Sequence, residues 1–174
     1  SAQGNPICNA QLYNLTIRHL RKPEKIMENM LMHSTDDDIS FHYEAYRIIG
    51  DTAEIDDIIK SEGFINLCAL DVKSTLSEET ANYVSTGVAE GAECILNALK
   101  AALDKLPIEI EDVSNMLIQV WFPKNIPHAL YMIDATLRFV DRHTKIDTNV
   151  FWGFCFDESL KGQQAKATLI AASI

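Results

Sequence analysis

The sequence predicts an α+β fold, an α/β two-layer arrangement in which helices pack on a mixed four-stranded sheet that follows a helical N-terminal arm. From Gly63 onward, short apolar runs alternate with amphipathic stretches at helical spacing, which indicates alternating strands and helices. Two apolar strands then follow one another at the C-terminal end. The 174 residues are 47% hydrophobic and 23% charged, a composition typical of a globular domain with a sizeable core.

The residues before Gly63 divide into an arm and a connecting helix. Residues 11–20 alternate apolar and polar side chains, which predicts a strand, and Pro23 suits the first position of a following helix. The acidic run Asp36–Asp38 marks a boundary. Beyond it, isoleucines at helical spacing predict one long helix, or two short helices broken at Gly50-Asp51. The expected arm, connecting helix and domain cover residues 1–39, 40–62 and 63–174.

The domain that begins at Gly63 is predicted element by element. Strands are expected at the short apolar runs, which cover residues 64–68, 82–88, 115–122, 148–156 and 166–173. Helices are expected at 71–79, at 92–106 and from Pro127 through Val140. Asp71 can cap the first of these helices. The segment Thr86–Gly91 is interpreted as a bare turn between strand and helix rather than as an anion site at a helix N-terminus.

The charge of the chain bears on its partners. The sequence has 25 acidic and 15 basic residues, a net charge of -10. This balance argues against nucleic acid or an anionic membrane as the main partner. No apolar run approaches the roughly 18 residues of a membrane helix, so we expect no direct membrane insertion. The four cysteines form no CxxC pair, which favours reduced, mostly buried thiols in a cytoplasmic protein.

Sequence motifs of known chemistry are missing. Neither GxGxxG nor GxxxxGK[ST] occurs, and no pair of histidines has metal-binding spacing. The acidic run Asp36–Asp38 lacks the spacing of a calcium loop and is interpreted as a solvated loop. We therefore expect no metal and no cofactor bound by this chain alone.

Several stretches of the sequence resemble the C-terminal domain of the FtsZ/tubulin superfamily, and bacterial FtsZ more than tubulin. GFINLCALDVK resembles the synergy loop of FtsZ, whose pattern is G-[LF]-I-N-[LV]-D-F-A-D-V-K. TGVAEG resembles the family's GTGVASG, and NMLIQV stands where the family has its VLVNI strand. The last two strands resemble the paired ending of the domain. These stretches cover residues 63–73, 86–91, 115–120, 149–156 and 165–173.

The resemblance implies a site that is shared between subunits. In the family, the synergy loop reaches into the nucleotide pocket of the next subunit, where an asparagine and two aspartates position the cation and the attacking water. Asn66 matches the asparagine and Asp71 the second aspartate, which makes them the candidate catalytic residues. Cys68 replaces the first aspartate, and a thiol is a poor ligand for Mg²⁺, so the loop is degenerate. In the alternative interpretation, Asp71 only caps its helix and Asn66 only satisfies backbone groups.

The resemblance also implies which parts of the family's machinery this chain lacks. The GTP-binding signature G-G-G-T-G-[ST]-G does not occur in the sequence, so GTP and Mg²⁺ are expected only through a partner's nucleotide-binding domain. The chain is expected to be no enzyme on its own, and at most the activating half of a GTPase. It is either the C-terminal part of a longer FtsZ-like protein or a separate domain, and residues 41–59 look like the helix that joins the two FtsZ domains.

Two functional hypotheses follow. The first is a protein-interaction module of the cell-division or cytoskeletal type, at a polymer interface, whose partner is another FtsZ-like subunit or a cell-division regulator; it can also form a homodimer. The second is a small ligand-binding or enzymatic α+β domain with a cleft near Thr86–Gly91 and Asp157-Glu158.

Overall fold

The computed structural model describes residues 43–61 and 63–173. The predicted arm over residues 1–39, including the strand at 11–20 and the helix from Pro23, lies outside these residues.

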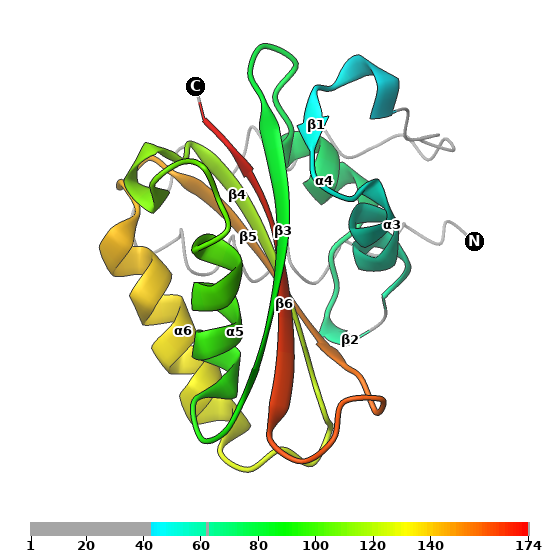
Figure 1. Ribbon diagram of the computed structural model, residues 1–174, viewed down its shortest axis with the longest axis vertical. Coiled ribbons are helices and arrows are strands. Elements are labelled where there is room, and N and C mark those ends of the chain that lie inside the picture. Colours follow the sequence, from blue (N-terminus) through cyan, green and yellow to red (C-terminus); the bar gives the residue numbers. More distant parts are fainter. Residues whose placement is uncertain (1–42, 62, 174) are drawn as a thin grey trace, which may run out of the picture.

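In the described part of the chain, six strands form one mixed sheet in the order β1-β3-β6-β4-β5-β2 (Figure 1). The strands are β1 (Ile48–Ile49), β2 (Gly63–Ile65), β3 (Asn82–Glu90), β4 (Asn115–Phe122), β5 (Asn149–Phe156) and β6 (Gln164–Ala172). β1 runs parallel to β3 and β4 parallel to β5, whereas the other neighbouring strands are antiparallel. The mixed sheet is confirmed. It has six strands where four were expected, because β1 was not predicted and the strand expected at 64–68, observed as β2, joins the edge of the same sheet.

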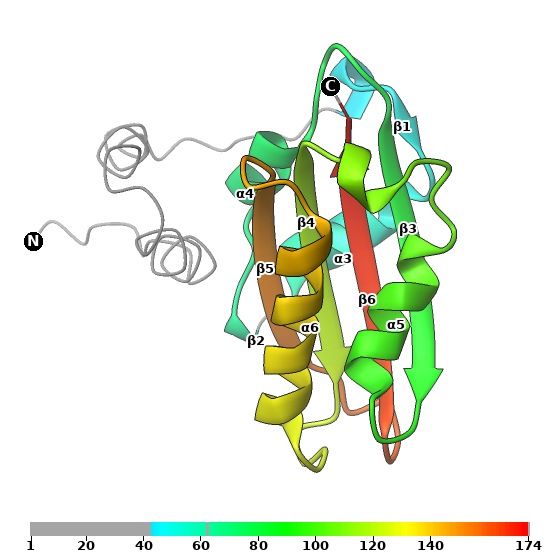
Figure 2. The same ribbon diagram turned by 90° about the vertical axis from the view of Figure 1, so that its left-hand side faces the viewer.

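Helices cover both faces of this sheet (Figures 1 and 2). α5 (Cys94–Leu103) and α6 (Ala129–His143) pack on one face. α3 (Thr52–Lys60) and α4 (Ala69–Thr75) pack on the other. The sheet is therefore the middle of three layers, and the expectation of two layers was wrong on this point.

Helices can cover both faces of the sheet because its central strands carry apolar side chains on both sides. In β4, Met116 and Ile118 face the core under α5 and α6, whereas Leu117 and Trp121 face the core under α3 and α4. Strands buried on both faces have nearly continuous apolar sequences, as NMLIQVWF in β4 has. Such a run predicted β4 at its observed bounds, but it does not reveal how many layers cover the strand.

The prediction of one long connecting helix over residues 40–62 is wrong for residues 43–61, the part that the structure describes. A short 3₁₀ turn, Tyr43–Ala45, precedes β1, and α3 begins only at Thr52. Gly50 between them has φ +133, a conformation that side chains disfavour and that ends the strand. The Asp51 carboxylate then accepts a hydrogen bond from the backbone N–H of Ala53 at 2.9 Å and caps α3. The break considered at Gly50-Asp51 is therefore where the helix begins.

The predicted turn at Thr86–Gly91 is also wrong, since β3 continues to Glu90. Gly91, with φ +105, makes the turn toward α5. Gly87 lies inside the strand, where a Cβ atom would stand 2.2 Å from the Ala98 carbonyl oxygen and 2.5 Å from the Ala102 nitrogen. The missing side chain thus lets the backbone of α5 approach β3 closely.

Candidate functional site

The segment that resembles the synergy loop, residues 63–73, runs from the edge strand β2 into the first turns of α4. The structure brings Asn66, Cys68 and Asp71 together within it. Asn66 Oδ1 accepts a hydrogen bond from the backbone N–H of Gly63 at 2.5 Å. Asp71 is fully buried in the first turn of α4, and its Oδ2 accepts from the backbone N–H of Cys68 at 2.9 Å. Both polar side chains therefore hold the backbone of their own loop.

These contacts bear on the two interpretations of the loop that the sequence leaves open. Asn66 and Asp71 both accept from backbone N–H groups, as in the interpretation that gives them a purely structural role. Asp71 caps α4 from the third helical position, while Cys68 occupies the N-cap. α4 accordingly begins at Ala69 and ends at Thr75, earlier than the predicted 71–79. Among the described residues, no group of three or more His, Cys, Asp or Glu side chains could hold a metal ion.

An apolar surface lies beside this loop, and we call it the aromatic edge: Phe64 and Phe156, with Phe122 and Phe154 beneath them. Phe64 on β2 is 41% exposed and Phe156 on β5 is 40% exposed. Their ring centroids are 5.4 Å apart. Phe64 also stacks on Phe154 at 5.9 Å and meets Phe122 edge-on at 6.1 Å. This surface could not be predicted from the sequence, because only the pairing of β2 with β5 brings the rings together.

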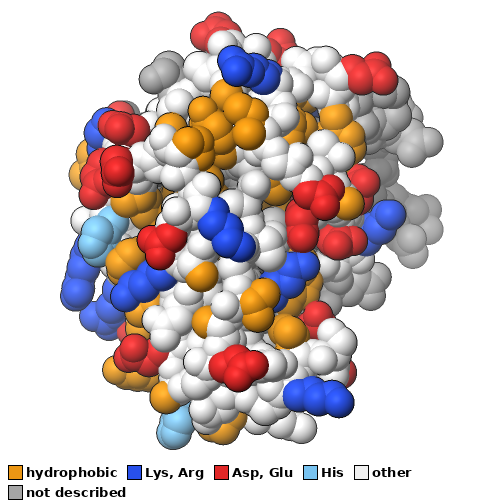
Figure 3. Space-filling model, viewed as in Figure 1, with side chains coloured by type: hydrophobic (Ala, Val, Ile, Leu, Met, Phe, Trp, Pro, Cys, Tyr) orange, Lys and Arg blue, Asp and Glu red, His pale blue; other side chains and the backbone are white. Residues whose placement is uncertain are grey.

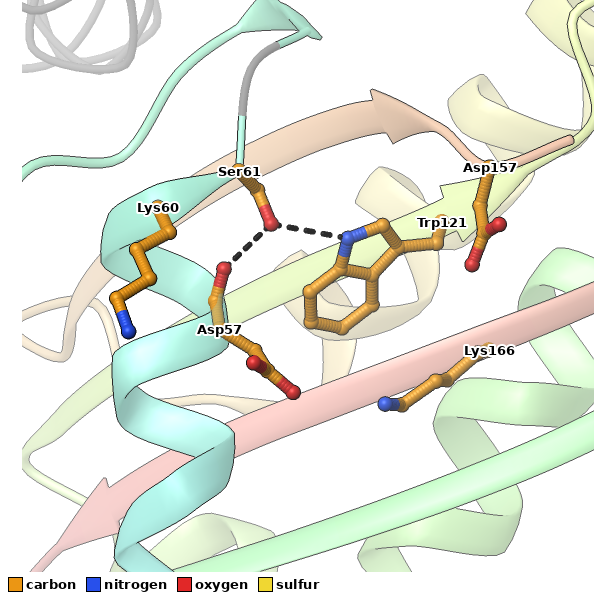
Figure 4. A pocket seen from close by; sticks show the side chains of 6 residues that line it. All are labelled: Asp57, Lys60, Ser61, Trp121, Asp157 and Lys166. Carbon is orange, nitrogen blue, oxygen red and sulfur yellow. Dashed lines mark hydrogen bonds between the residues drawn. The ribbon is translucent and has the colours of Figure 1, made fainter. Parts of the chain in front are cut away.

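A hollow of about 280 Å³ lies between α3 and the sheet (Figure 4). It is lined by Asp57, Lys60, Ser61, Trp121, Asp157 and Lys166. Trp121 Nε1 donates to Ser61 Oγ at 3.2 Å, and this hydroxyl donates to the Asp57 carbonyl oxygen at 2.5 Å. The charges that line the hollow are of both signs, so it has no strong preference for an anion or a cation.

Interactions within the protein occupy several of these charged groups. Lys166 Nζ lies 3.1 Å from Glu54 Oε2 and 4.8 Å from the centre of the Trp121 ring. Asp157 Oδ1 accepts from both the backbone and the hydroxyl of Ser159. The cleft expected near Thr86–Gly91 and Asp157-Glu158 is not a single cleft, since Thr86 and Asp157 line two different hollows.

The described cysteines are free thiols, as expected, and Cys94 and Cys155 are buried. Burial raises the pKa of Cys155 to about 11, although the hydrogen bond from Gln119 Nε2 lowers it in part. Burial also raises the pKa of the Cys94 thiol. Neither cysteine therefore has the lowered pKa of a reactive nucleophile.

The comparisons with known proteins point to one superfamily. No protein-family model matches the chain. The cell division protein FtsZ of a Wolbachia species is 24% identical over 123 residues, which are 69% of this chain and 30% of that protein. FtsZ of Rhizobium radiobacter is 27% identical over 111 residues, which are 62% of this chain and 19% of that protein.

Solved structures share the fold. The FtsZ dimer of M. jannaschii matches with a TM-score of 0.58 and 17% identity, over 91% of this chain and 43% of that chain. CetZ of Methanosaeta thermophila matches with a TM-score of 0.53 and 12% identity, over 70% of this chain and 34% of that chain. The chain is related to the FtsZ/tubulin superfamily.

The FtsZ resemblance seen in the sequence is thereby confirmed at the level of the superfamily. The chain spans about a fifth to two fifths of the length of the curated FtsZ relatives it matches. None of the described helices has the length and hydropathy needed to cross a membrane. On the face drawn in Figure 3, acidic and basic side chains are interspersed.

Proposed function

We propose that the chain is an FtsZ-like C-terminal domain that acts in the cytoplasm as a protein-interaction module at a polymer interface. Its partner is another FtsZ-like subunit or a cell-division regulator, and it binds no GTP of its own. The aromatic edge is the observation that carries this proposal. Phe64 and Phe156 expose about two fifths of their surface directly beside the loop that resembles the synergy loop. Exposed apolar groups gathered at one place are typical of a protein-binding surface.

The chemistry of the loop supports binding rather than catalysis. Asn66 and Asp71 hold backbone N–H groups of their own loop, and Cys68 offers a thiol where the family pattern has a carboxylate. Hard Mg²⁺ prefers oxygen ligands. The loop is therefore at most the activating half of a shared GTPase, and GTP and Mg²⁺ would come from the partner.

The test is binding to polymers of Rhizobium radiobacter FtsZ, one of the relatives. Purified chain is mixed with FtsZ and GTP, the polymers are sedimented, and bound chain is quantified. We expect Phe64→Ser to weaken binding about tenfold, because a hot-spot aromatic side chain is worth more than about 1 kcal/mol. Leu130→Ser is the matched control, since Leu130 is 81% exposed on α6 and lies outside the aromatic edge.

Two results would contradict the proposal. One is equal binding by wild type and Phe64→Ser, with thermal unfolding showing that both are folded. The other is GTP hydrolysis by the purified chain alone at a rate typical of FtsZ.

The alternative function, a small ligand-binding or enzymatic domain, rests on the hollow around Trp121. A thermal-shift screen against metabolite classes tests it, because a ligand that binds only the folded chain raises the melting temperature. A Lys166→Met variant identifies the hollow as the site, since it should abolish any such shift.

A further inference from the structure

The outer edge of β3 is open over much of its length. β1 pairs with β3 only at Asn82 and Tyr83. From Ser85 to Glu90, β3 pairs with β6 on its inner side, and no strand among the described residues pairs with its outer side. An open edge offers unpaired backbone donors and acceptors to another strand.

The hydrogen bonds at the two ends of β3 show which of its peptide groups face outward. Asn82 N–H donates outward to the Arg47 carbonyl, whereas Gly91 N–H donates inward to the Gln163 carbonyl next to β6. Because the direction alternates along an antiparallel strand, the N–H and C=O groups of the even-numbered residues point outward. These residues are Thr86, Val88 and Glu90. Lys105 Nζ donates to the Thr86 carbonyl at 2.5 Å, in agreement with this orientation.

The side chains along this edge are self-complementary. Val88 is 58% exposed at the centre. Two residues away on one side lies exposed Glu90, and two residues away on the other lies Thr86, whose carbonyl holds the exposed ammonium of Lys105. An antiparallel copy placed about a two-fold axis at Val88 would bring each Glu90 beside the Lys105 of the second copy.

We propose that the β3 edge pairs antiparallel with the β3 edge of a second copy of this chain, which joins the two sheets into one. Val88 opposes Val88, and Thr86 opposes Glu90 of the second copy. The outward peptide groups exchange hydrogen bonds, and the Glu90 carboxylate meets Lys105. An interface in which one patch meets itself is the geometry of a two-fold dimer.

The surroundings of Thr86 leave room for this arrangement. A hollow of about 290 Å³ lies beside it, lined by Asp51, Glu54, Val84, Ser85, Thr86 and Lys105. The negative charge of Glu54 is paired with Lys166, and the Asp51 carboxylate caps α3. Lys105, whose ammonium donates to the Thr86 carbonyl, is the basic residue of this lining and the cation that the incoming Glu90 would meet.

This dimer does not rest on the proposed function, because it uses the opposite edge of the sheet. The aromatic edge belongs to β2 and β5, whereas β3 lies near the other end of the strand order. The Phe64→Ser variant should therefore leave the dimer unchanged, and each proposal can fail without the other.

The test is sedimentation equilibrium of the chain from about 1 µM to 1 mM. We expect a reversible dimer whose Kd rises about tenfold in Lys105→Glu and in Glu90→Lys, because each change places like charges together at two equivalent contacts. The double variant Glu90→Lys/Lys105→Glu should return close to the wild-type Kd. Lys145→Glu, which changes an exposed lysine in the loop after α6, should have no effect.

A second variant tests the backbone pairing itself. Val88→Pro removes an N–H that points outward, and proline is tolerated at an edge position of this kind. We expect this variant to abolish the dimer. In the wild type, we expect hydrogen exchange to show that the Val88 and Glu90 amides become more protected as the protein concentration rises. A monomer at all concentrations would overturn the proposal. A dimer that is insensitive to Val88→Pro and to the charge changes would also overturn it.

Discussion

The carboxylate of Asp71 accepts a hydrogen bond from the backbone N–H of Cys68, with 2.9 Å between Oδ2 and N. The Asp71 side chain thereby reaches from the first turn of α4 to the N-cap residue of the same helix. This is half of a capping box, and the other half is the N-cap side chain. In this chain the N-cap side chain is a thiol, which accepts hydrogen bonds only weakly. The loop that resembles a catalytic element is thus built around the start of a helix.

Replacing Cys68 with serine should stabilise the chain. A serine hydroxyl is among the preferred N-cap acceptors, so Cys68→Ser is expected to raise the free energy of unfolding by about 0.5 to 1 kcal/mol. Urea unfolding measures this change. The matched control is Cys94→Ser, which places a hydroxyl at a fully buried position and should destabilise. A Cys68→Ser variant no more stable than wild type would show that the thiol already caps the helix adequately.

Adding one methyl group at Gly87 should be costly. The new Cβ would lie 2.2 Å from the Ala98 carbonyl oxygen and 2.5 Å from the Ala102 nitrogen. These are backbone atoms of α5, which cannot move aside as a flexible side chain can. We expect Gly87→Ala to lower the free energy of unfolding by about 3 kcal/mol.

Chemical denaturation checks the Gly87→Ala prediction, and Val88→Ala is the neighbouring control. Val88 is 58% exposed, so its truncation should cost well under 1 kcal/mol. Similar losses for the two variants would mean that α5 can shift away from β3.

The sequence patterns predicted most of the described domain, because its central strands and helices have a clear local period. β4 has its predicted bounds, since NMLIQVWF is apolar throughout. The isoleucines around Gly50 were misassigned, because Ile48 and Ile49 in β1 and Ile55 and Ile58 in α3 also fit one helical repeat. The positive φ of Gly50 and the cap formed by Asp51 separate the two elements.

The sequence could bring the candidate residues together in one segment, but it could not predict what surrounds them. The motif placed Asn66, Cys68 and Asp71 in one loop, and a local motif is sufficient for this. The aromatic edge depends on Gly63 pairing with Cys155 and on Ile65 pairing with Phe154. Such long-range strand pairing leaves no periodic signal in the sequence, and β2 has only three residues.

The stability of the chain should fall as the pH rises from about 9 to about 11. The pKa of Cys155 is raised from 9.0 to about 11 by burial, so the folded thiol keeps its proton where the unfolded thiol has lost it. The unfolded state then binds fewer protons, and stability decreases with pH in this window. We expect the decrease to be smaller in Cys155→Ala, measured by urea unfolding at a series of pH values. Parallel profiles for the two proteins would contradict the prediction.

The ion pair between Glu54 and Lys166 should couple more strongly than a fully exposed pair. Its side chains are only 23% and 26% exposed, with 3.1 Å between Oε2 and Nζ. Lys166 also lies over the Trp121 ring, which restricts its ammonium before the pair forms. A double-mutant cycle with Glu54→Gln and Lys166→Met isolates the pair from its other contacts. We expect a coupling energy of about 1 kcal/mol, because partial burial reduces the screening by water.

The exposed pair Asp134–Arg138 on α6 provides the comparison for this cycle. Its N–O distance is shorter, at 2.8 Å, but its side chains are 58% and 66% exposed. A pair four residues apart on a helix surface is expected to contribute about 0.3 kcal/mol. Burial, rather than distance, should therefore decide the order of the two coupling energies. Equal coupling energies for the α6 pair and for Glu54–Lys166 would contradict the prediction that burial decides their order. Raising the salt concentration then tests the same point independently, since it should weaken the exposed pair more.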